Sequence, residues 1–310
     1  MPFGFDEFKV KKPTFAFRIL IDRYNIEQRV AQRMIDKGRL LCNGESIRIK
    51  NVKIFGDIKV LIFIPKSKGL KPIFKTKDFM LFDKPSGVLV HPNKILTPYS
   101  LLDEIRTFGD DNSNGVHRID QETSGLLLAS VNRKTEIKLK GLFEKKEIQK
   151  RYLAWVRGKT QKNFSVDAAI KVRDSYSEDL KHKVEINSCG KTAFTEFERL
   201  DYSKEHNSSL VLVTPHTGRT HQIRIHLFHV KHPILGDPIY GTDYDTSEAY
   251  LEERLSQEDR IKITGAPRLM LHANELDFML NGNRYLLKSK VDFISLKDLL
   301  AKVEEQNFKG

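Results

Sequence analysis

Hydrophobic positions near the start of the chain repeat first at a helical period and then at a strand period. Residues 26–37 carry apolar side chains at helical spacing, so we expect an amphipathic helix with one inward face. The apolar positions of this helix are Ile26, Val30, Met34 and Ile35. Two short runs at 40–42 and 46–48 flank the turn pair Asn43-Gly44, which predicts a β-hairpin. With a further strand at 60–64, residues 10–66 are typical of one small α+β module.

A polar, basic stretch at 67–72 contains glycine and proline and is typical of a linker. From 73 to 310 short apolar runs alternate with turns and helical stretches, which predicts an α+β domain around one sheet. Strands are expected at 79–82, 126–128 and 150–156. Amphipathic or surface helices are expected in the basic stretch after Arg133 and at 294–306. A further short helix is expected at 247–255, within a charged insert between Gly241 and Gly265. Nothing in the insert has the pattern of a catalytic motif.

Charge and composition narrow the class of protein. The 310 residues include 53 Lys and Arg against 41 Asp and Glu, a formal net charge of +12, which suits a polyanionic partner. Only two cysteines occur, Cys42 and Cys189, so neither a disulfide framework nor a Cys-x-x-Cys metal site is expected. No apolar run reaches membrane-spanning length and no signal peptide is evident. We therefore expect a soluble, cytoplasmic protein.

The most informative segment is 116–128. Arg118 and Asp120 stand two residues apart, a Thr-Ser-Gly turn follows, and then comes an apolar run long enough to form a buried strand. Charge is costly at the mouth of a hydrophobic strand, and functional sites are often found in such places. For an isolated Arg-x-Asp, a capped turn with a surface ion pair is the competing interpretation.

Three later segments add candidate chemistry. Lys150-Arg151-Tyr152-Leu153-Ala154 begins a strand, 217–226 reads Thr-Gly-Arg-Thr-His-Gln-Ile-Arg-Ile-His, and 268–273 reads Arg-Leu-Met-Leu-His-Ala. Five histidines fall between 216 and 232, which raises the alternative of a metal site. Their spacing argues against it, because neither a helix nor a strand puts residues five apart on one face. We expect no metal.

Together these segments closely resemble the RluA-type pseudouridine synthases, a family that rearranges uridine in RNA. A Lys-Pro-x-Gly and Val-His-Pro succession at 84–92 matches the opening of that family's catalytic domain. The resemblance implies the pseudouridine synthase fold, a curved mixed β-sheet with flanking helices, over 73–310. It gives the role of essential carboxylate to Asp120, that of the active-site tyrosine to Tyr152, and that of an arginine paired with the aspartate to Arg224.

Further contacts with RNA follow from the same resemblance. Arg268 and Leu269 are expected to close the floor of the pocket, and Arg118 to fill the gap left by the extruded base. The guanidinium fork of Arg224 is expected to hold the Asp120 carboxylate ionised and in one orientation. Tyr152 offers a ring for stacking and a hydroxyl for proton exchange. Whether Asp120 acts as nucleophile or as base is left open.

Residues 10–66 resemble the alpha-L RNA-binding domain, which is shared by a ribosomal protein and many RNA-modifying enzymes. The cations Arg29, Arg33 and Lys37 recur every fourth residue, and the resemblance makes them candidate phosphate contacts. Without it, a solvated helix face is the plainer interpretation.

The implied protein is a cofactor-independent, monomeric RNA pseudouridine synthase. The sequence has neither a Gly-x-Gly-x-x-Gly nor a Walker-type loop, in line with a reaction that needs no nucleotide cofactor. Large-subunit ribosomal RNA is favoured over transfer RNA, because the alpha-L module accompanies the ribosomal members more often. A non-catalytic RNA-binding or ribosome-assembly protein and a metal-dependent nuclease are the alternatives from other classes.

Overall fold

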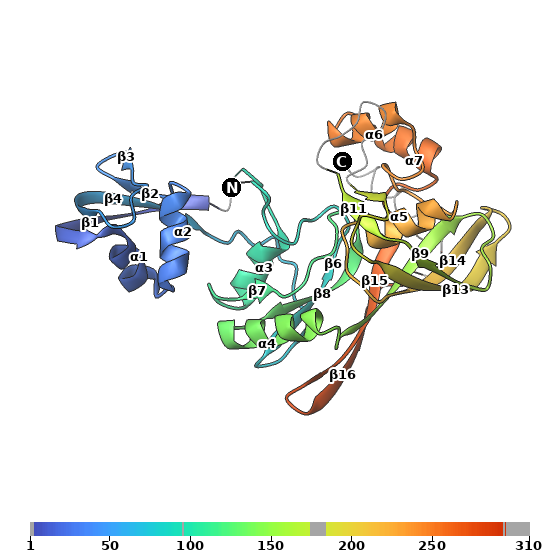
Figure 1. Ribbon diagram of the computed structural model, residues 1–310, viewed down its shortest axis with the longest axis horizontal. Coiled ribbons are helices and arrows are strands. Elements are labelled where there is room, and N and C mark those ends of the chain that lie inside the picture. Colours follow the sequence, from blue (N-terminus) through green and yellow to red (C-terminus); the bar gives the residue numbers. More distant parts are fainter. Residues whose placement is uncertain (1–2, 95, 174–183, 294, 296–310) are drawn as a thin grey trace. The chain divides into compact units, whose positions relative to one another are not determined.

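The protein is described by a computed structural model for residues 3–94, 96–173, 184–293 and 295 (Figure 1). The chain forms two compact units, one of Met1–Gly69 with Pro92–Thr107 and one of Leu70–His91 with Phe108–Gly310. Apart from residue 295, the helix expected at 294–306 lies outside the described residues. Within the described residues, no helix is long and apolar enough to cross a membrane.

The first unit is an antiparallel sheet of order β1-β4-β2-β3 with two helices packed on it. Its core is formed by small and aliphatic side chains from both helices and from the inner face of the sheet, including Ala16, Leu20, Ile35, Leu40 and Ile58. Its elements are β1 (Phe3–Phe15), α1 (Ala16–Tyr24), α2 (Gln28–Asp36), β2 (Leu40–Cys42), β3 (Glu45–Ser46) and β4 (Lys53–Phe63).

The hairpin predicted around Asn43-Gly44 is confirmed, with φ of 48° and 88° at these two residues, as a tight two-residue hairpin turn requires. The helix prediction was wrong in one respect, because α2 begins only at Gln28 and exposes Val30. Ala31 and Ile35, one helical turn apart, form the buried row instead. The long strand β1 and helix α1 were not predicted.

Residues 92–107 join the first unit through α3 (Leu101–Phe108). The Asp103 carboxylate accepts a hydrogen bond from the Lys66 amide at 2.9 Å, and Glu104 accepts from the Ser67 hydroxyl and the Lys68 amide at 2.6 Å each. The start of the predicted linker is therefore tied to a helix. The functional boundaries at 10–66 and 73–310 stay predictions.

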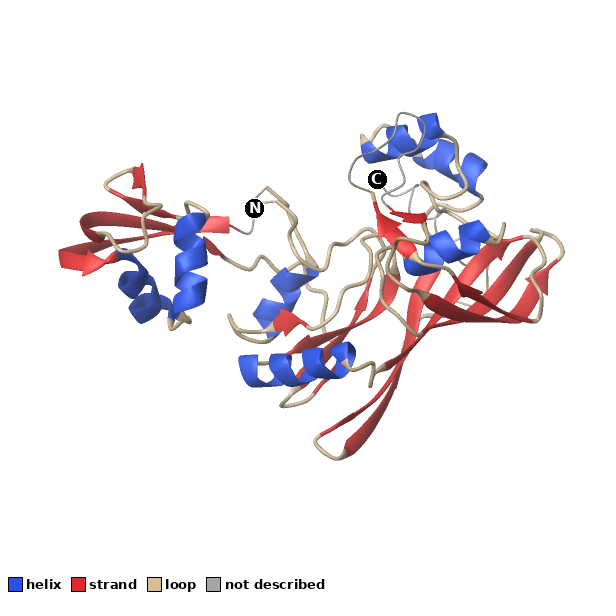
Figure 2. Cartoon of the chain, viewed as in Figure 1, coloured by secondary structure: helices blue, strands red, loops and turns tan. Residues whose placement is uncertain are grey.

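The second unit is built on a ten-stranded mixed sheet, which confirms the predicted α+β class (Figure 2). The main path runs β10-β13-β14-β9-β15-β8-β6-β5, with β16 paired to β15 and β7 to β8. Its strands are β5 (Phe74–Lys75), β6 (Phe79–Lys84), β7 (Asn114–Gly115), β8 (Ser124–Ser130), β9 (Gln149–Arg157), β10 (Asn163–Asp167), β13 (Phe194–Ser203), β14 (Ser208–Pro215), β15 (Leu271–Leu280) and β16 (Asn283–Lys288).

Helices and a small second sheet complete this unit. They are α4 (Arg133–Glu144), α5 (Gln222–His229), α6 (Tyr244–Leu251), α7 (Gln257–Thr264) and the pair β11 (Ile170–Val172) and β12 (Val184–Ile186). Helix α4 ends because Lys146 takes the left-handed conformation, with φ of 60°. The predicted insert is two helices, α6 and α7, where one was expected.

Strand β15 has a special place in the sheet. It lies between β9 and β8, and its pairing with β8 at His272 and Ala273 is parallel whereas its pairing with β9 is antiparallel. The turn before β8 and the start of β9 are thereby held at one edge of the same sheet, where the functional residues gather.

Candidate active site

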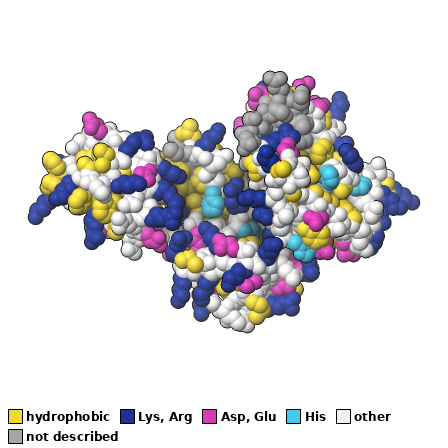
Figure 3. Space-filling view, in the orientation of Figure 1, with side chains coloured by type: hydrophobic (Ala, Val, Ile, Leu, Met, Phe, Trp, Pro, Cys, Tyr) yellow, Lys and Arg dark blue, Asp and Glu magenta, His cyan; other side chains and the backbone are white. Residues whose placement is uncertain are grey.

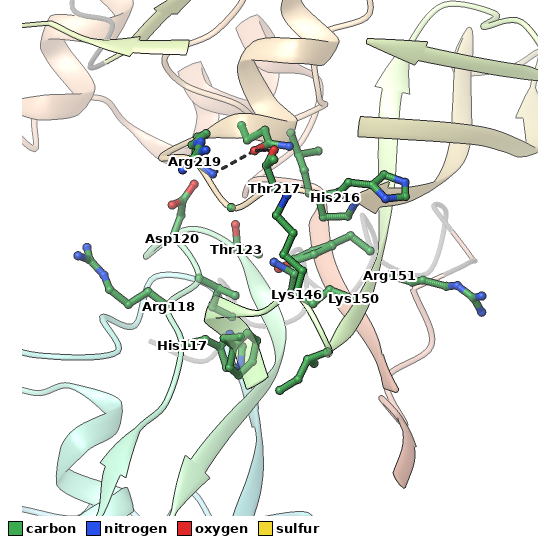
Figure 4. A pocket seen from close by; sticks show the side chains of 18 of the residues that line it. His117, Arg118, Asp120, Thr123, Lys146, Lys150, Arg151, His216, Thr217 and Arg219 are labelled. Carbon is green, nitrogen blue, oxygen red and sulfur yellow. Dashed lines mark hydrogen bonds between the residues drawn. The ribbon is translucent and has the colours of Figure 1, made fainter. Parts of the chain in front are cut away.

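A cleft of about 1120 Å³ opens in the second unit where three distant segments meet. The turn before β8, the connection from α4 to β9, and the segment from the end of β14 to α5 line it (Figure 4). Four of the predicted site residues, Arg118, Asp120, Tyr152 and Arg224, lie among its lining residues. Lysine and arginine side chains are frequent on the face of this unit that Figure 3 shows.

The turn that carries Asp120 is fastened by the segment Lys84–Gly87. The Lys84 ammonium is fully buried and donates to the carbonyls of Pro85, Val88 and Gln121 at 2.7 to 2.9 Å. The Ser86 hydroxyl donates to the Glu122 carbonyl at 2.6 Å, and the Gly87 amide to the Gln121 carbonyl at 2.9 Å. The segment was interpreted only as a fold marker, and the structure shows how it fixes the turn.

Burial lowers the pKa of Lys84 to about 7, against the attraction of Glu122 and Asp120, which acts to raise it. Three carbonyl acceptors supply the hydrogen bonds that this ammonium loses on leaving water. Lys84 is thus a structural lysine, bonded on all three of its donor positions.

Arg224, on α5, lies between two carboxylates and is only 3% exposed. Its Nε and Nη2 donate to the two oxygens of Asp237 at 2.7 and 2.8 Å, while its Nη1 is 3.6 Å from Asp120 Oδ2. The expected ion pair between Arg224 and Asp120 is present, but the expectation that the guanidinium fork holds Asp120 was wrong, because the fork holds Asp237. Asp237 is completely buried and needs two good hydrogen bonds, whereas the Asp120 side chain is 30% exposed.

Asp237 was missed as a functional partner, although its segment was noted in the sequence. Burial acts to raise its pKa, but the Arg224 charge and hydrogen bonds, with backbone amides of Tyr240 and Ile239, bring the pKa below its usual value. Burial likewise acts to lower the pKa of Arg224, and the attraction of Asp237 outweighs it, so the pKa is raised. Both groups stay charged, and Arg224 faces Asp120 as a fixed cation.

Tyr152 lies on β9 with its side chain buried beside the cleft. Burial raises its pKa, and the negative charge of Asp120 raises it further. The phenol is therefore protonated at neutral pH, and its hydroxyl can donate a hydrogen bond or a proton toward Asp120 or a bound base.

Glu122, two residues after Asp120, points to the opposite side of the turn. Its Oε1 accepts from the Tyr250 hydroxyl at 2.9 Å and its Oε2 from Arg260 Nη2 at 2.6 Å. Arg260 also donates to the Gly236 carbonyl at 2.8 Å, next to Asp237. Tyr250 belongs to α6 and Arg260 to α7, so the insert does more than cover the surface: it braces the Asp120 turn.

Four of the five histidines of the cluster, His216, His221, His226 and His232, each have a hydrogen-bond partner of their own. His221 Nε2 is 3.9 Å from Asp120, and its Nδ1 hydrogen-bonds the Tyr240 hydroxyl at 2.9 Å. His226 is buried and bonded to the Thr195 hydroxyl and the Ala168 carbonyl. In the part of the chain that is described, no three His, Cys, Asp or Glu side chains gather as a metal-binding group.

His117, next to Arg118, is a packed residue. Its Nε2 accepts a hydrogen bond from the Leu128 amide at 3.0 Å, and its ring stacks on Phe143. Burial, with a smaller effect from the Lys150 charge, lowers the pKa of His117 to about 3. Its ring is neutral at physiological pH and fixes the entry to the Asp120 turn.

The remaining predicted residues lie outside the cleft or at its edge. Arg118 is exposed at the cleft, and Figure 4 shows its side chain extending away from Asp120. Leu269 is fully buried, and Arg268 Nη1 donates to the Ser124 hydroxyl and to the Leu269 carbonyl at 3.2 Å each. Neither lines the cleft, although both lie behind the turn at the start of β8.

In the first unit, three exposed cations remain on and just after α2: Arg29, Arg33 and Lys37.

Comparisons with known proteins give one consistent family. Residues 78–229 match the sequence model of the RNA pseudouridylate synthase family. A Helicobacter pylori J99 protein described as an uncharacterized RNA pseudouridine synthase is 38% identical over 93% of this chain and 96% of its own length. The ribosomal large subunit pseudouridine synthase D of Nitrosomonas europaea is 33% identical over 67% of this chain and 57% of its own.

A solved structure shares the fold. The human RNA pseudouridylate synthase domain containing 1 aligns with a TM-score of 0.58 and 24% identity over 77% of this chain and 97% of its own.

Proposed function

From its membership in the RNA pseudouridine synthase family, to which this chain belongs, we propose that the protein isomerises specific uridines of large-subunit ribosomal RNA with Asp120 as the essential carboxylate. One observation carries the assignment. Asp120 is a half-exposed carboxylate in the cleft, and a guanidinium already neutralised by Asp237 faces it at 3.6 Å. Its oxygens are left to act on a substrate.

The reaction breaks the bond between ribose C1′ and uracil N1 and forms one between C1′ and C5. The C5 proton is lost and N1 gains one, so the product is an isomer and no redox partner is needed. Asp120 attacks the sugar as a nucleophile or removes a proton from it as a base. Arg224 favours the ionised form of Asp120 when a base closes the cleft and removes water.

Tyr152 is the proposed stacking partner of the uracil. Its buried ring borders the cleft and its hydroxyl is protonated, so it can stack and exchange a proton in one position. Arg118, exposed at the cleft, is proposed to enter the space that the extruded base leaves. Extrusion costs a few kcal/mol and less in a loop than in a duplex, which favours a loop uridine.

The first unit is proposed as the alpha-L RNA-binding module. The exposed cations Arg29, Arg33 and Lys37 are spaced to meet successive phosphates, and within the described residues none of them forms an ion pair. Changing all three to glutamine should lower the salt dependence of RNA binding by about one unit of log–log slope per lost phosphate contact.

Ribosomal RNA is proposed over transfer RNA as the substrate. The name of the Nitrosomonas europaea relative specifies the large ribosomal subunit. A transfer-RNA target would appear directly in the experiment below.

A site map of pseudouridine tests the proposal. RNA from cells lacking the protein is compared with RNA from the same cells carrying wild type, Asp120→Asn or Glu144→Gln, using a pseudouridine adduct that stops reverse transcription. Glu144 is an exposed carboxylate lining the same cleft and serves as the matched control. A stop that returns with wild type and Glu144→Gln but not with Asp120→Asn supports the proposal. Restoration by Asp120→Asn contradicts it.

A further inference from the structure

Lys150 is a half-buried lysine whose side chain enters the cleft. It precedes Tyr152 by two residues on β9, and alternation along a strand puts both side chains on one face. Neither an ion pair nor a hydrogen bond is formed by its ammonium with any residue that the structure describes. This sets it apart from Lys140, Arg151 and Arg224, which line the same cleft and have protein partners.

Other cations that line the cleft are paired with protein carboxylates. Lys140 donates to Glu136 at 2.6 Å, Arg151 to Glu275 at 2.8 Å, and Arg224 to Asp237. Lys84 is buried with three carbonyl acceptors. A charge withdrawn from water costs stability unless an acceptor replaces the lost hydration. None of the residues that the structure describes supplies such an acceptor to the Lys150 ammonium.

Burial lowers the pKa of Lys150, which shows that its ammonium is partly desolvated. Removing the charge should then cost the folded protein nothing. A lysine kept at such a place for structural reasons would behave in the opposite way, because its removal would leave carbonyls or carboxylates unpaired.

The surroundings of the ammonium suit a ligand backbone. Gly218 is exposed, and a Cβ built on it would lie 3.6 Å from Lys150 Nζ, so the ammonium lies against the turn at Thr217–Arg219. Figure 4 shows Lys150 reaching toward Thr217. Glycine at this point lets a ligand backbone approach closely.

We propose that Lys150 and the Gly218 turn form a binding site for one phosphodiester of the RNA, next to the nucleotide whose base stacks on Tyr152. The inference rests on the proposed function. A phosphodiester carries a full negative charge, and it is therefore a better partner for an unpaired ammonium than a neutral base carbonyl. Two residues of strand span about 6.6 Å, so the cation lies within reach of the stacked nucleotide.

Salt dependence of binding is the first test. Wild type, Lys150→Met, Lys150→Arg and the control Lys145→Met are each titrated with a single-stranded oligouridylate at several salt concentrations. Lys145 is exposed in the same connection but does not line the cleft. We expect Lys150→Met to lower the log–log slope by about one and Lys150→Arg to restore it. An unchanged slope in Lys150→Met overturns the proposal.

Stability separates a ligand site from a structural role. Lys150→Met should unfold at the same temperature as wild type or higher, because it removes a charge without a protein partner. A clear decrease in melting temperature together with an unchanged salt slope would make Lys150 a structural residue.

The phosphate itself can be located in a hairpin carrying the mapped uridine. Each phosphodiester near that uridine is replaced in turn by an uncharged methylphosphonate. For wild type, one replacement should weaken binding by about tenfold and raise KM more than it lowers kcat. Lys150→Met should be insensitive to that replacement. Equal sensitivity of both proteins at every linkage overturns the proposal.

The outcomes also distinguish this site from the proposed function. If wild type forms no pseudouridine but the Lys150-dependent slope on oligouridylate is present, the phosphate site stands and the isomerase proposal fails. If pseudouridine forms and the slope is indifferent to Lys150, only the phosphate site is lost.

Discussion

The Asp120–Thr123 turn carries two carboxylates, Glu122 and Asp120, and each of them faces an arginine at a different distance. On the packed side, both oxygens of Glu122 are used, by Tyr250 at 2.9 Å and by Arg260 at 2.6 Å. On the cleft side, the side chain of Asp120 has only longer contacts, 3.6 Å to Arg224 and 3.9 Å to His221. Two carboxylates of one turn thus differ in how much of their bonding capacity remains for a ligand.

This difference shows how a carboxylate can be held in place while its oxygens stay open to a ligand. Arg224 is fixed by Asp237 and Glu122 is fixed by Arg260. Arg260 also donates to the carbonyl of Gly236, the residue before Asp237. The contacts of Glu122 on the packed side set the position of the turn. The Asp120 oxygens on the cleft side are therefore not needed to hold it. Substitutions on the two sides should therefore have separable effects.

The largest expected effect comes from Asp237→Asn. It leaves Arg224 buried with only a distant partner, and breaking a buried pair in this way costs about 3–5 kcal/mol of unfolding free energy. Urea unfolding measures the loss. Asp277→Asn, which breaks a pair with the exposed Arg284, should cost about 1 kcal/mol or less. Equal losses in the two variants would mean that the Arg224 fork is not a buried anchor.

Glu122→Gln should cost on the order of 3 kcal/mol, because Arg260 loses its charged partner. Burial acts to raise the pKa of Glu122, but Arg260 and Tyr250 bring it below its ordinary value. The stabilisation is then complete above the unfolded pKa of about 4.3 and is lost as pH falls through the lower, folded pKa. Urea unfolding at a series of pH values should show wild type and variant converging below about pH 4. A constant difference between them would exclude this linkage.

Arg224→Lys should lower both stability and turnover. From the sequence, loss of the fork is expected to affect the orientation of Asp120. In the structure the fork binds Asp237, so we also expect a loss of about 2 kcal/mol as one charge-assisted hydrogen bond disappears. Unfolding and single-turnover rates should be measured together. A variant of unchanged stability would show that a single ammonium satisfies Asp237.

The smallest effect is expected for Tyr250→Phe. It removes one hydrogen bond to Glu122 and leaves the Arg260 pair, so about 1 kcal/mol should be lost. Turnover should fall less than in Glu122→Gln. Tyr202→Phe, whose hydroxyl bonds the exposed Asn207, is the matched control and should change stability less. A larger loss of turnover in Tyr250→Phe than in Glu122→Gln would reverse the proposed order of the brace.

Elements with a strong local pattern could be predicted from the sequence. The turn Asn43-Gly44 needs two left-handed residues, and β8 contains the apolar run Leu126–Ala129, so both were found. Strand β1 alternates half-buried and exposed positions from Gly4 to Lys11, but the hydrophobicity of its residues does not follow this alternation. The inward-facing Asp6 is charged and bonds Arg23 and Tyr24, and Phe5 is exposed. A polar residue on the inward face, bonded to partners far away in the sequence, obscures the two-residue hydrophobic period that would predict a strand.

The same limit applies to the site. Asp120, Tyr152 and Arg224 stand in short motifs, so the resemblance to a known family located them. Asp237 and Arg260 act through partners 13 and 138 residues away, and no local spacing encodes such a pair. The insert that carries Arg260 contains no recognisable motif, so no role was predicted for it. In the structure, the Arg260 guanidinium gives it a role by binding Glu122.

The central place of β15 sets the order of events during synthesis. Strands β8 and β9 have no common neighbour until β15 is inserted between them, and Ser124 bonds His272 across 148 residues of chain. A ribosome adding 5–20 residues per second needs on the order of ten seconds between Tyr152 and the end of β15. During that interval the Asp120 carboxylate and the Tyr152 phenol of a nascent chain belong to segments that are not yet joined in one sheet. Its capacity for RNA chemistry begins only when the last strands have left the ribosome.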